Sequence, residues 1–395
     1  MQNLDYIKNT EHENIMPTYA RFEVAIESGK GATLTDTCGK NYIDFTSGIG
    51  VSSLGYADEN WVKAVSEQAS KLAHISNLYY NPVQIELAKL LCEKSGFSKV
   101  FFANSGAEAN EGMIKLARKY SFDKYGKDRS TIVSLVNSFH GRTITTLACT
   151  GQDNFHNYFF PFTEGFKFAD ANNIESLKTA CTKDVCAIML ESIQGEGGVL
   201  PLDADFVAQA AEFAKQNDIL LLFDEVQTGI GRTGKLFGFG HYNVSPDVIS
   251  VAKGLAGGLP MGAVLCSEVL GNVLNAGMHG TTFGGNPICS AGAIEVLNRV
   301  ANAEFLHQVC EKGEYIVNRL KKIPSVKNIR GKGLMIGFEI EGIDSKKAAI
   351  ELAKMGLLIL TAKNLLRMLP PLVITQAEID KGLSILEEYI GGITQ

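Results

Sequence analysis

The sequence has no long hydrophobic run, no block of like charges and no internal repeat. No apolar stretch approaches the roughly 20 residues that a membrane helix needs, and residues 1–13 are polar and acidic, unlike an export signal. The 37 basic and 43 acidic residues are interspersed and give a formal net charge of −6, which disfavours nucleic acids and anionic membranes as partners. We therefore expect a cytoplasmic protein that binds small molecules.

Signatures of disulfides and metal sites are also missing. The eight cysteines are scattered, form no Cys-x-x-Cys pair and have no histidine at metal-ligand spacing. We expect buried, reduced thiols and no metal. A chain of 395 residues, 45% of them hydrophobic, can bury a large core without such cross-links.

The middle of the chain alternates short apolar runs with amphipathic stretches. The expected strands are residues 99–103, 131–136, 185–190, 219–223, 247–252 and 261–266. Amphipathic stretches such as 107–120 and 205–217 separate most of them. This alternation is typical of an α/β domain with a mostly parallel sheet flanked by helices, and the apolar runs indicate strands buried on both faces.

The C-terminal quarter has a different pattern, which predicts a smaller α+β domain. Its expected elements are a helix over 295–320, a strand over 333–340, and helices over 345–354 and 376–389. We assign residues 61–294 to the large domain and 295–395 to the small one. Residues 1–60, which contain a glycine-rich hairpin pattern, are expected to pack with the small domain.

Ligands of open α/β sheets bind beyond the carboxyl ends of the strands. Ser105, Gly106 and Ala107 begin a helix directly after an expected strand, so free backbone N–H groups and the helix dipole there favour an anion such as a phosphate. The pattern Ser105-x-x-Glu108 also fits a capping box, and the two interpretations are compatible.

Two charged residues follow other expected strands. Asp224 ends an apolar run, where a charge is costly unless it meets a cation such as a protonated pyridine nitrogen; a helix cap or an arginine partner is an alternative. Lys253 ends another run, and burial there lowers its pKa, as suits a Schiff-base amine. The alternative for Lys253 is an extended side chain that reaches solvent.

The stretch Gly229-x-Gly231-x-x-Gly234 formally matches a dinucleotide-binding fingerprint. However, no helical pattern begins at Gly234, and Leu236 stands where a P-loop needs Ser or Thr. We predict a glycine-rich active-site loop rather than a nucleotide site.

Five ordered motifs lie across the chain: Asn-Ser-Gly-Ala-Glu-Ala-Asn at 104–110, Phe-His-Gly-Arg-Thr at 139–143, Leu-Phe-Asp-Glu-Val-Gln-Thr at 222–228, Ala-Lys-Gly at 252–254 and Thr-Thr-Phe-Gly-Gly-Asn-Pro at 281–287. Together they resemble the class III aminotransferases, and most closely those that act on N-acetylornithine. The likeness runs from about residue 19 to residue 390. It implies a fold-type-I architecture, pyridoxal 5′-phosphate as the cofactor, and a homodimer whose active site is shared across the interface.

The resemblance also implies roles at the cofactor. Lys253 forms the Schiff base and moves the proton, Asp224 pairs with the pyridine nitrogen, and Phe139 stacks on the ring. Ser105, Gly106 and Ala107 hold the phosphate. The remaining implied contacts are Val226, Gln227 near the phenolic oxygen, and Thr282, which reaches the phosphate from the neighbouring subunit.

For the substrates, the resemblance implies two arginines. Arg142 binds the α-carboxylate of N-acetylornithine and later the side-chain carboxylate of glutamate. Arg367 binds the α-carboxylate of glutamate, and Glu196 pairs with Arg367 when glutamate is absent. Thr281 is a further substrate contact, and Ile49 stands where ornithine aminotransferases carry a tyrosine.

The implied reaction moves the terminal amino group of N-acetylornithine to 2-oxoglutarate by a ping-pong mechanism, giving N-acetylglutamate 5-semialdehyde and glutamate, as in arginine biosynthesis. Alternative donors are ornithine, succinylornithine, diaminopimelate and 4-aminobutyrate. Residues 55–58 depart from the Gly-His-x-His-Pro stretch common in the family. From other classes, a nucleotide-dependent oxidoreductase and a non-catalytic cofactor-binding protein remain as alternatives.

Overall fold

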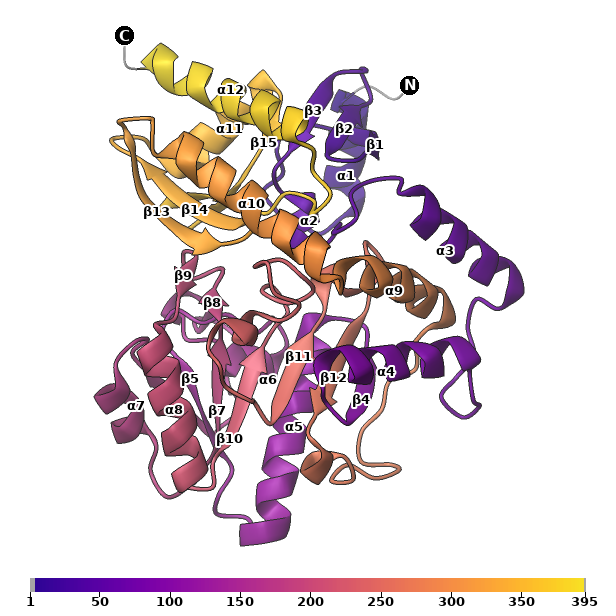
Figure 1. Cartoon of the computed structure of the whole chain (residues 1–395), viewed down its shortest axis with the longest axis vertical. Helices are drawn as coiled ribbons and strands as arrows, with labels where there is room; N and C mark the ends of the chain where they lie inside the picture. Colours follow the sequence, from indigo (N-terminus) through magenta and orange to yellow (C-terminus); the bar gives the residue numbers. More distant parts are fainter. Residues whose placement is uncertain (1–3, 394–395) are drawn as a thin grey trace.

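Short runs of aliphatic and β-branched residues form a seven-stranded sheet at the centre of the large domain (Figure 1). The computed structural model describes residues 4–393. The sheet order is β4 (Lys99–Ala103), β12 (Gly262–Cys266), β11 (Val248–Val251), β10 (Leu220–Asp224), β7 (Val185–Glu191), β5 (Thr131–Leu135) and β6 (Phe166–Ala169). Within this sheet β12 alone runs antiparallel to its neighbours. The predicted α/β class and the six predicted strands are confirmed, and β6 is an additional strand.

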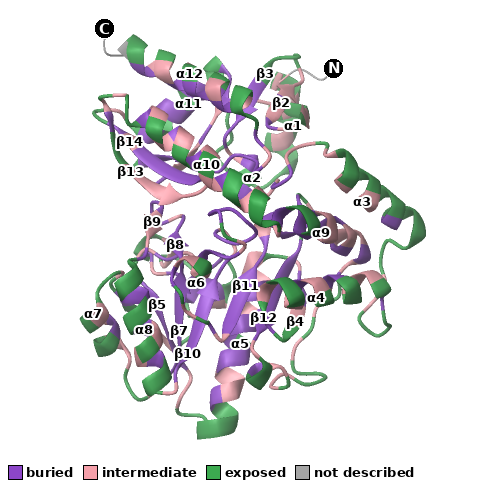
Figure 2. Cartoon of the chain, viewed as in Figure 1, coloured by how far each residue is buried: buried purple, intermediate pink, exposed green. Residues whose placement is uncertain are grey.

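Helices cover both faces of this sheet. Along β10, Leu220 and Leu222 pack in one hydrophobic cluster with Met113 of α5 (Gly106–Tyr125). Leu221 and Phe223 point to the other face, into the cluster that contains Phe206 of α8 (Ala204–Gln216). Every residue of β5, β7, β10, β11 and β12 is buried (Figure 2). Burial on both faces explains why these strands are continuously apolar.

A second, antiparallel sheet forms the C-terminal part of the molecule. Its order is β13 (Val326–Lys332), β14 (Met335–Ile340), β17 (Leu365–Met368) and β16 (Leu360–Ala362). The helices of this part are α10 (Ala303–Leu320), α11 (Ser345–Met355) and α12 (Gln376–Ile393). The parallel pairing of β3 (Asn41–Asp44) with β15 (Leu357–Leu358) joins the N-terminal strands to it (Figure 1). β1 (Ile26–Lys30) and β2 (Thr33–Asp36) complete that third sheet.

The helix predicted over 295–320 is wrong as a single element. α9 (Pro287–Val300) ends before Asn302, whose side chain accepts hydrogen bonds from the N–H groups of Glu304 and Phe305 and so begins α10. Asparagine is a strong N-cap residue because its side-chain oxygen pairs with otherwise free N–H groups. The domain boundaries expected at 60/61 and 294/295 fall inside α3 (Glu59–Lys71) and α9.

The divergent stretch at 55–58 stabilises local structure. The Tyr56 hydroxyl donates to Asp44 Oδ2 at 2.8 Å, and Asp58 Oδ1 accepts from the Trp61 N–H at the start of α3. Asp58 also forms an ion pair with Arg299 of α9, at 2.6 Å. These contacts tie the N-terminal strands to α3 and α9.

Arg232 connects three parts of the chain and is 2% exposed. Its Nη1 donates to the carbonyl oxygens of Leu334, at 3.1 Å, and Pro370, at 2.5 Å. Its Nη2 donates to Ser47 Oγ at 3.4 Å. Burial lowers the pKa of Arg232 to about 9, and the charge of Asp44 opposes this shift. The large domain, the C-terminal part and the N-terminal segment therefore meet at one guanidinium group.

All eight cysteines are free. Cys149, Cys186 and Cys266 are buried as expected, whereas Cys92, Cys181, Cys289 and Cys310 are only half-buried. Cys38 is exposed because it lies in the turn between β2 and β3. In residues 4–393, no helix combines the length and the apolar character that crossing a membrane requires.

Candidate active site

A cavity of about 430 Å³ opens beyond the carboxyl ends of the central strands. Five of those strands deliver its polar residues: β4, β5, β7, β10 and β11. Its lining comprises Val51, Asn104, Ser105, Gly106, Ala107, Asn110, Phe139, His140, Gly141, Arg142, Glu191, Asp224, Val226, Gln227, Ala252, Lys253, Gly258, Leu259, Pro260 and Met261. The place of the cavity is the one expected for an α/β sheet.

One wall of the cavity is the N-terminus of α5, a helix of 20 residues. Ser105 is its N-cap, and Ser105 Oγ accepts from the Glu108 N–H at 3.1 Å. A Cβ atom at Gly106 would lie 2.7 Å from Val226 Cγ1, so only glycine permits this approach. Free N–H groups and the positive end of the helix dipole face the cavity, a combination that binds phosphate.

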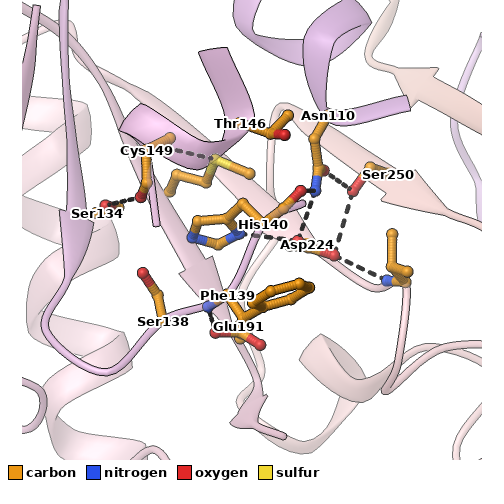
Figure 3. Close-up of polar contacts among 12 residues, drawn as sticks. Asn110, Ser134, Ser138, Phe139, His140, Thr146, Cys149, Glu191, Asp224 and Ser250 are labelled. Carbon is orange, nitrogen blue, oxygen red and sulfur yellow. Dashed lines mark hydrogen bonds and ion pairs between the residues drawn. The ribbon is translucent and has the colours of Figure 1, made fainter. Parts of the chain in front are cut away.

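Asp224 is 4% exposed and is surrounded by hydrogen-bond donors (Figure 3). Its Oδ2 accepts from Asn110 Nδ2 and His140 Nδ1, each at 2.8 Å, and its Oδ1 accepts from the Val226 N–H at 2.9 Å. A carboxylate only accepts, so the contact assigns a proton to His140 Nδ1. The network holds Asp224 as an acceptor aimed into the cavity, ready for a cationic partner.

Glu191 ends β7 and pairs in register with Asp224 of β10. Its Oε2 accepts from the Phe139 N–H at 3.1 Å. Burial raises the pKa of Glu191 well above its usual range and the charge of Asp224 raises it further, while the Phe139 hydrogen bond and Lys253 oppose the shift. The neutral acid is therefore favoured beside the Asp224 carboxylate.

Lys253 follows β11 and has a positive φ of 39°, an uncommon backbone conformation for a lysine. Burial lowers the pKa of its ammonium group, and the carboxylates of Glu196, Asp224 and Glu191 oppose this shift. A lysine amine with a lowered pKa is a good nucleophile towards carbonyl groups.

Arg367 and Glu196 lie behind Gln227, outside the residues that line the cavity itself. Arg367 Nη1 donates to Glu196 Oε1 at 2.8 Å and to Gln227 Oε1 at 3.1 Å. Arg367 is 2% exposed, and its Nε is buried without a hydrogen-bond partner in the described chain. Burial raises the pKa of Glu196, but the charge and hydrogen bond of Arg367 outweigh burial and hold it below its usual value.

The structure gathers most of the predicted site residues. Nine line the cavity: Ser105, Gly106, Ala107, Phe139, Arg142, Asp224, Val226, Gln227 and Lys253. Thr281 Oγ1 accepts from Asn104 Nδ2 at 2.8 Å at its edge. Thr282 and Ile49 are exposed and lie outside the lining of this single chain.

The glycine-rich loop at 229–234 is not part of the cavity, which corrects the expectation of an active-site loop. A Cβ atom at Gly231 would lie 2.5 Å from Val300 Cγ1, and one at Gly234 would lie 2.2 Å from Cys310 Sγ. The glycines therefore permit close packing against α9 and α10.

Sequence reasoning assigned no role to Asn110, His140 or Glu191. Asn110 and His140 stand inside the quoted motifs, and Glu191 ends an expected strand, so each had a positional signal. Their contacts with Asp224 and Phe139 join residues that are distant in the sequence, which position alone does not reveal.

The residues present fit pyridoxal phosphate. The N-terminus of α5 suits the phosphate, and Asp224 suits a protonated ring nitrogen. Phe139 offers an aromatic face and Lys253 an amine for the aldehyde. The close approach of Val226 leaves no room for a residue larger than glycine at position 106, beside the free N–H groups of the helix.

Comparison with known proteins identifies similar chains. The family described as Aminotransferase class-III matches residues 15–390. The chain is 50% identical over 388 residues to an acetylornithine aminotransferase of Haemophilus ducreyi, covering 98% of each chain. An ornithine aminotransferase of Toxoplasma gondii, crystallised with partial occupancy of PLP at its active site, has a TM-score of 0.94 and 30% identity, covering 99% of this chain and 95% of that one. An N-acetylornithine aminotransferase of Stenotrophomonas maltophilia has a TM-score of 0.84 and 34% identity, with 98% and 99% covered.

We predict that Glu191→Gln and Asp224→Asn have opposite effects on stability. The folded state raises the pKa of Glu191, so the wild type loses stability as the pH rises from the ordinary pKa of a glutamate to the raised pKa. Glutamine cannot ionise, so Glu191→Gln does not lose this stability. The advantage of Glu191→Gln over the wild type should therefore grow with pH. Asp224→Asn places an amide NH₂ group against the donors Asn110 Nδ2 and His140 Nδ1 and should lower the free energy of unfolding by about 1–3 kcal/mol.

Urea unfolding between pH 5 and pH 9 measures both effects. Glu341→Gln, at an exposed glutamate outside the cavity, is the matched control and should show no growing advantage. A difference between Glu191→Gln and the wild type that stays constant with pH would contradict the prediction.

Proposed function

The chain belongs to the class III aminotransferases, and from this membership we propose that it moves the terminal amino group of N-acetylornithine to 2-oxoglutarate with bound pyridoxal phosphate. The products are N-acetylglutamate 5-semialdehyde and glutamate, a step of arginine biosynthesis. The observation that carries the proposal is one cavity that joins Lys253, Asp224 and the N-terminus of α5. The free cysteines support a cytoplasmic location.

The choice of donor rests on the relatives. The Haemophilus ducreyi acetylornithine aminotransferase is 50% identical, whereas the Toxoplasma gondii ornithine aminotransferase is 30% identical despite its TM-score of 0.94. Backbone similarity follows the family fold, which donor specificity does not alter. Sequence identity over nearly the whole chain therefore favours N-acetylornithine over ornithine.

Bound pyridoxal phosphate supplies an aldehyde that exchanges between amines and a ring that accepts an electron pair. Asp224 would hold the ring nitrogen protonated, because its carboxylate is fixed by His140 and Asn110. Lys253 Nζ would bind the aldehyde until the donor amine displaces it. The freed Nζ would then move the proton from the donor carbon to the former aldehyde carbon of the cofactor, acting first as a general base and then as a general acid.

Two arginines would orient the substrates. Arg142 lines the cavity and would bind the carboxylate end of either substrate through its guanidinium N–H groups. Arg367 would bind the second carboxylate of 2-oxoglutarate or glutamate. Because Glu196 occupies Arg367 in the structure, the donor N-acetylornithine would leave that pair intact.

The absorption spectrum of the cofactor-reconstituted protein tests the function. We expect a visible band that N-acetylornithine bleaches faster than ornithine or 4-aminobutyrate, and that 2-oxoglutarate restores. Lys253→Ala is the control and should lack the exchange, because no amine of the chain then binds the aldehyde.

Absence of a band in the reconstituted wild type would overturn the cofactor assignment. A band that another donor bleaches faster would keep the family and replace the donor. A requirement for a nicotinamide cofactor would instead support the oxidoreductase alternative.

We further propose that Glu196 is a switch that frees Arg367 for glutamate. In Glu196→Ala, Arg367 loses its counter-charge and keeps only the hydrogen bond to Gln227, so 2-oxoglutarate and glutamate should bind about 10-fold more tightly, as expected for a charge-assisted hydrogen bond. The half-reaction with N-acetylornithine should slow when glutamate is present, because glutamate then competes. Single-turnover absorbance measures the two half-reactions separately, and unchanged rates in both would exclude the switch.

We also propose a homodimer. Four exposed apolar residues form a patch beside Thr282: Leu78 (85% exposed), Tyr79 (65%), Tyr80 (95%) and Phe283 (58%). His74 and Phe283 rings lie 5.0 Å apart, and Asn77 Nδ2 donates to the Gly284 carbonyl at 2.9 Å, so segment 74–80 contacts loop 281–284. Such a patch is typical of a protein interface, and a second copy there would bring its Thr282 to a shared site.

Light scattering tests this assembly. The wild type should have twice the mass of the chain, and the double variant Leu78→Asp/Tyr80→Asp should be monomeric and retain the cofactor less well. Ile350→Asp, at an exposed residue of α11 away from the patch, should remain dimeric. A monomeric wild type that still binds the cofactor would contradict the proposal.

A further inference from the structure

Arg142 is held by aromatic rings rather than by acceptors. Its Cζ lies 4.3 Å from the centroid of the Phe155 ring and 5.6 Å from that of Phe139. Arg142 is exposed at the cavity, and within residues 4–393 it has no hydrogen bond or ion pair. The two rings contact each other with centroids 5.9 Å apart at 68°. An edge-to-face pair therefore forms the support of this guanidinium.

Arg142 is supported by aromatic rings, whereas Arg367 is held by hydrogen bonds to polar side chains. A cation over a ring is attracted by the ring quadrupole, an interaction that uses none of the five guanidinium N–H donors. Arg367 instead donates hydrogen bonds from Nη1 to Glu196 and Gln227. Of the two arginines, Arg142 keeps its donors free for a carboxylate at all times.

Phe155 has a fixed place because its segment is joined to the segment that carries Phe139. The Asn137 N–H donates to the Gly151 carbonyl at 2.7 Å, and the Gly151 N–H donates to Ser138 Oγ at 3.0 Å. Gln152 Nε2 donates to the Ser138 carbonyl at 3.0 Å, and the Phe155 N–H donates to the Gln152 carbonyl at 3.0 Å.

Glycine at position 151 makes this junction possible. A Cβ atom there would lie 2.1 Å from the Leu135 carbonyl oxygen, a distance that no side chain tolerates. The chain after Gly151 therefore runs directly beside the end of β5, and Phe155 follows one short turn, Asp153–Phe155, later.

We propose that Phe155 is a positioning residue that holds the Arg142 guanidinium with its N–H donors free, as a receptor for the carboxylate of each substrate. The inference rests on the proposed function only in that the substrates carry carboxylates. Phe155 itself lies outside the cavity lining. It acts through Arg142, so its removal should weaken carboxylate binding and leave the chemical step intact.

The test compares Phe155→Leu, which keeps an apolar side chain without a ring, with Phe155→Tyr, which keeps the ring. In Phe155→Leu the KM for N-acetylornithine and for 2-oxoglutarate should rise about 5-fold, the equivalent of about 1 kcal/mol for a cation–π contact, with kcat within about 2-fold. Phe155→Tyr should restore both values. Titration calorimetry with glutarate, a dicarboxylate without an amino group, should show the same 5-fold loss without turnover.

A double-mutant cycle with Arg142→Gln separates this role from a general effect on packing. Once the guanidinium is absent, Phe155→Leu should cause no further loss of glutarate binding, because the two changes remove one interaction. An equal loss in both backgrounds would overturn the proposal. So would wild-type affinity in Phe155→Leu, or a loss of the cofactor absorption band, which would assign Phe155 to the support of Phe139.

Two controls keep the result decisive. Phe155→Met replaces Phe155→Leu if the latter unfolds, and urea unfolding midpoints establish that the variants are folded. If the wild type prefers ornithine or 4-aminobutyrate, the proposed donor is wrong. The KM of each Phe155 variant relative to the wild type is then measured with the preferred donor, which also carries a carboxylate. Failure of the function is thus seen in the wild type, and failure of the Phe155 role in the variants.

Discussion

The Asp224 carboxylate is buried at the end of a central strand, and an isolated charge there would be strongly destabilising. The donors that surround it come from α5, from the segment after β5 and from the turn after β10. Ser250 Oγ donates to Asn110 Oδ1 at 2.6 Å, which orients the amide so that its NH₂ group faces Asp224. Satisfying one charge thus fixes the mutual positions of the helix N-terminus, the Phe139 segment and the β10 turn, which are the parts that a bound cofactor needs.

The two arginines proposed to bind substrate are held in the structure in two different ways. Arg367 is buried and is paired with the counter-charge of Glu196, which the proposed switch would displace when a ligand carboxylate binds. Arg142 is exposed and needs support rather than neutralisation, which aromatic rings provide.

Much of the fold was predictable from the sequence, because buried parallel strands are continuously apolar and their polar ends identify the binding edge. Nine of the expected site residues line the cavity for that reason. The break at Asn302 was missed because apolar spacing continues across it, although a capping residue marks it. The pairing of Glu196 with Arg367, 171 residues apart, was predicted only through the family resemblance, and the structure contains it. The contact of Phe155 with Arg142 was missed because it depends on tertiary approach. The role proposed for Thr282 needs a second chain, which the pattern of one sequence does not reveal.

The buried Arg232 bears on how Arg142 and Arg367 are placed relative to each other. Arg142 belongs to the sheet-centred domain and Arg367 to β17 of the C-terminal part, while Arg232 joins those two bodies through the Leu334 and Pro370 carbonyls. The separation of the two proposed carboxylate receptors is therefore set by the angle between the bodies. If Arg142 and Arg367 bind the two carboxylates of one substrate as proposed, that angle also sets the length of dicarboxylate that fits between them, and the buried Arg232 guanidinium holds the angle fixed.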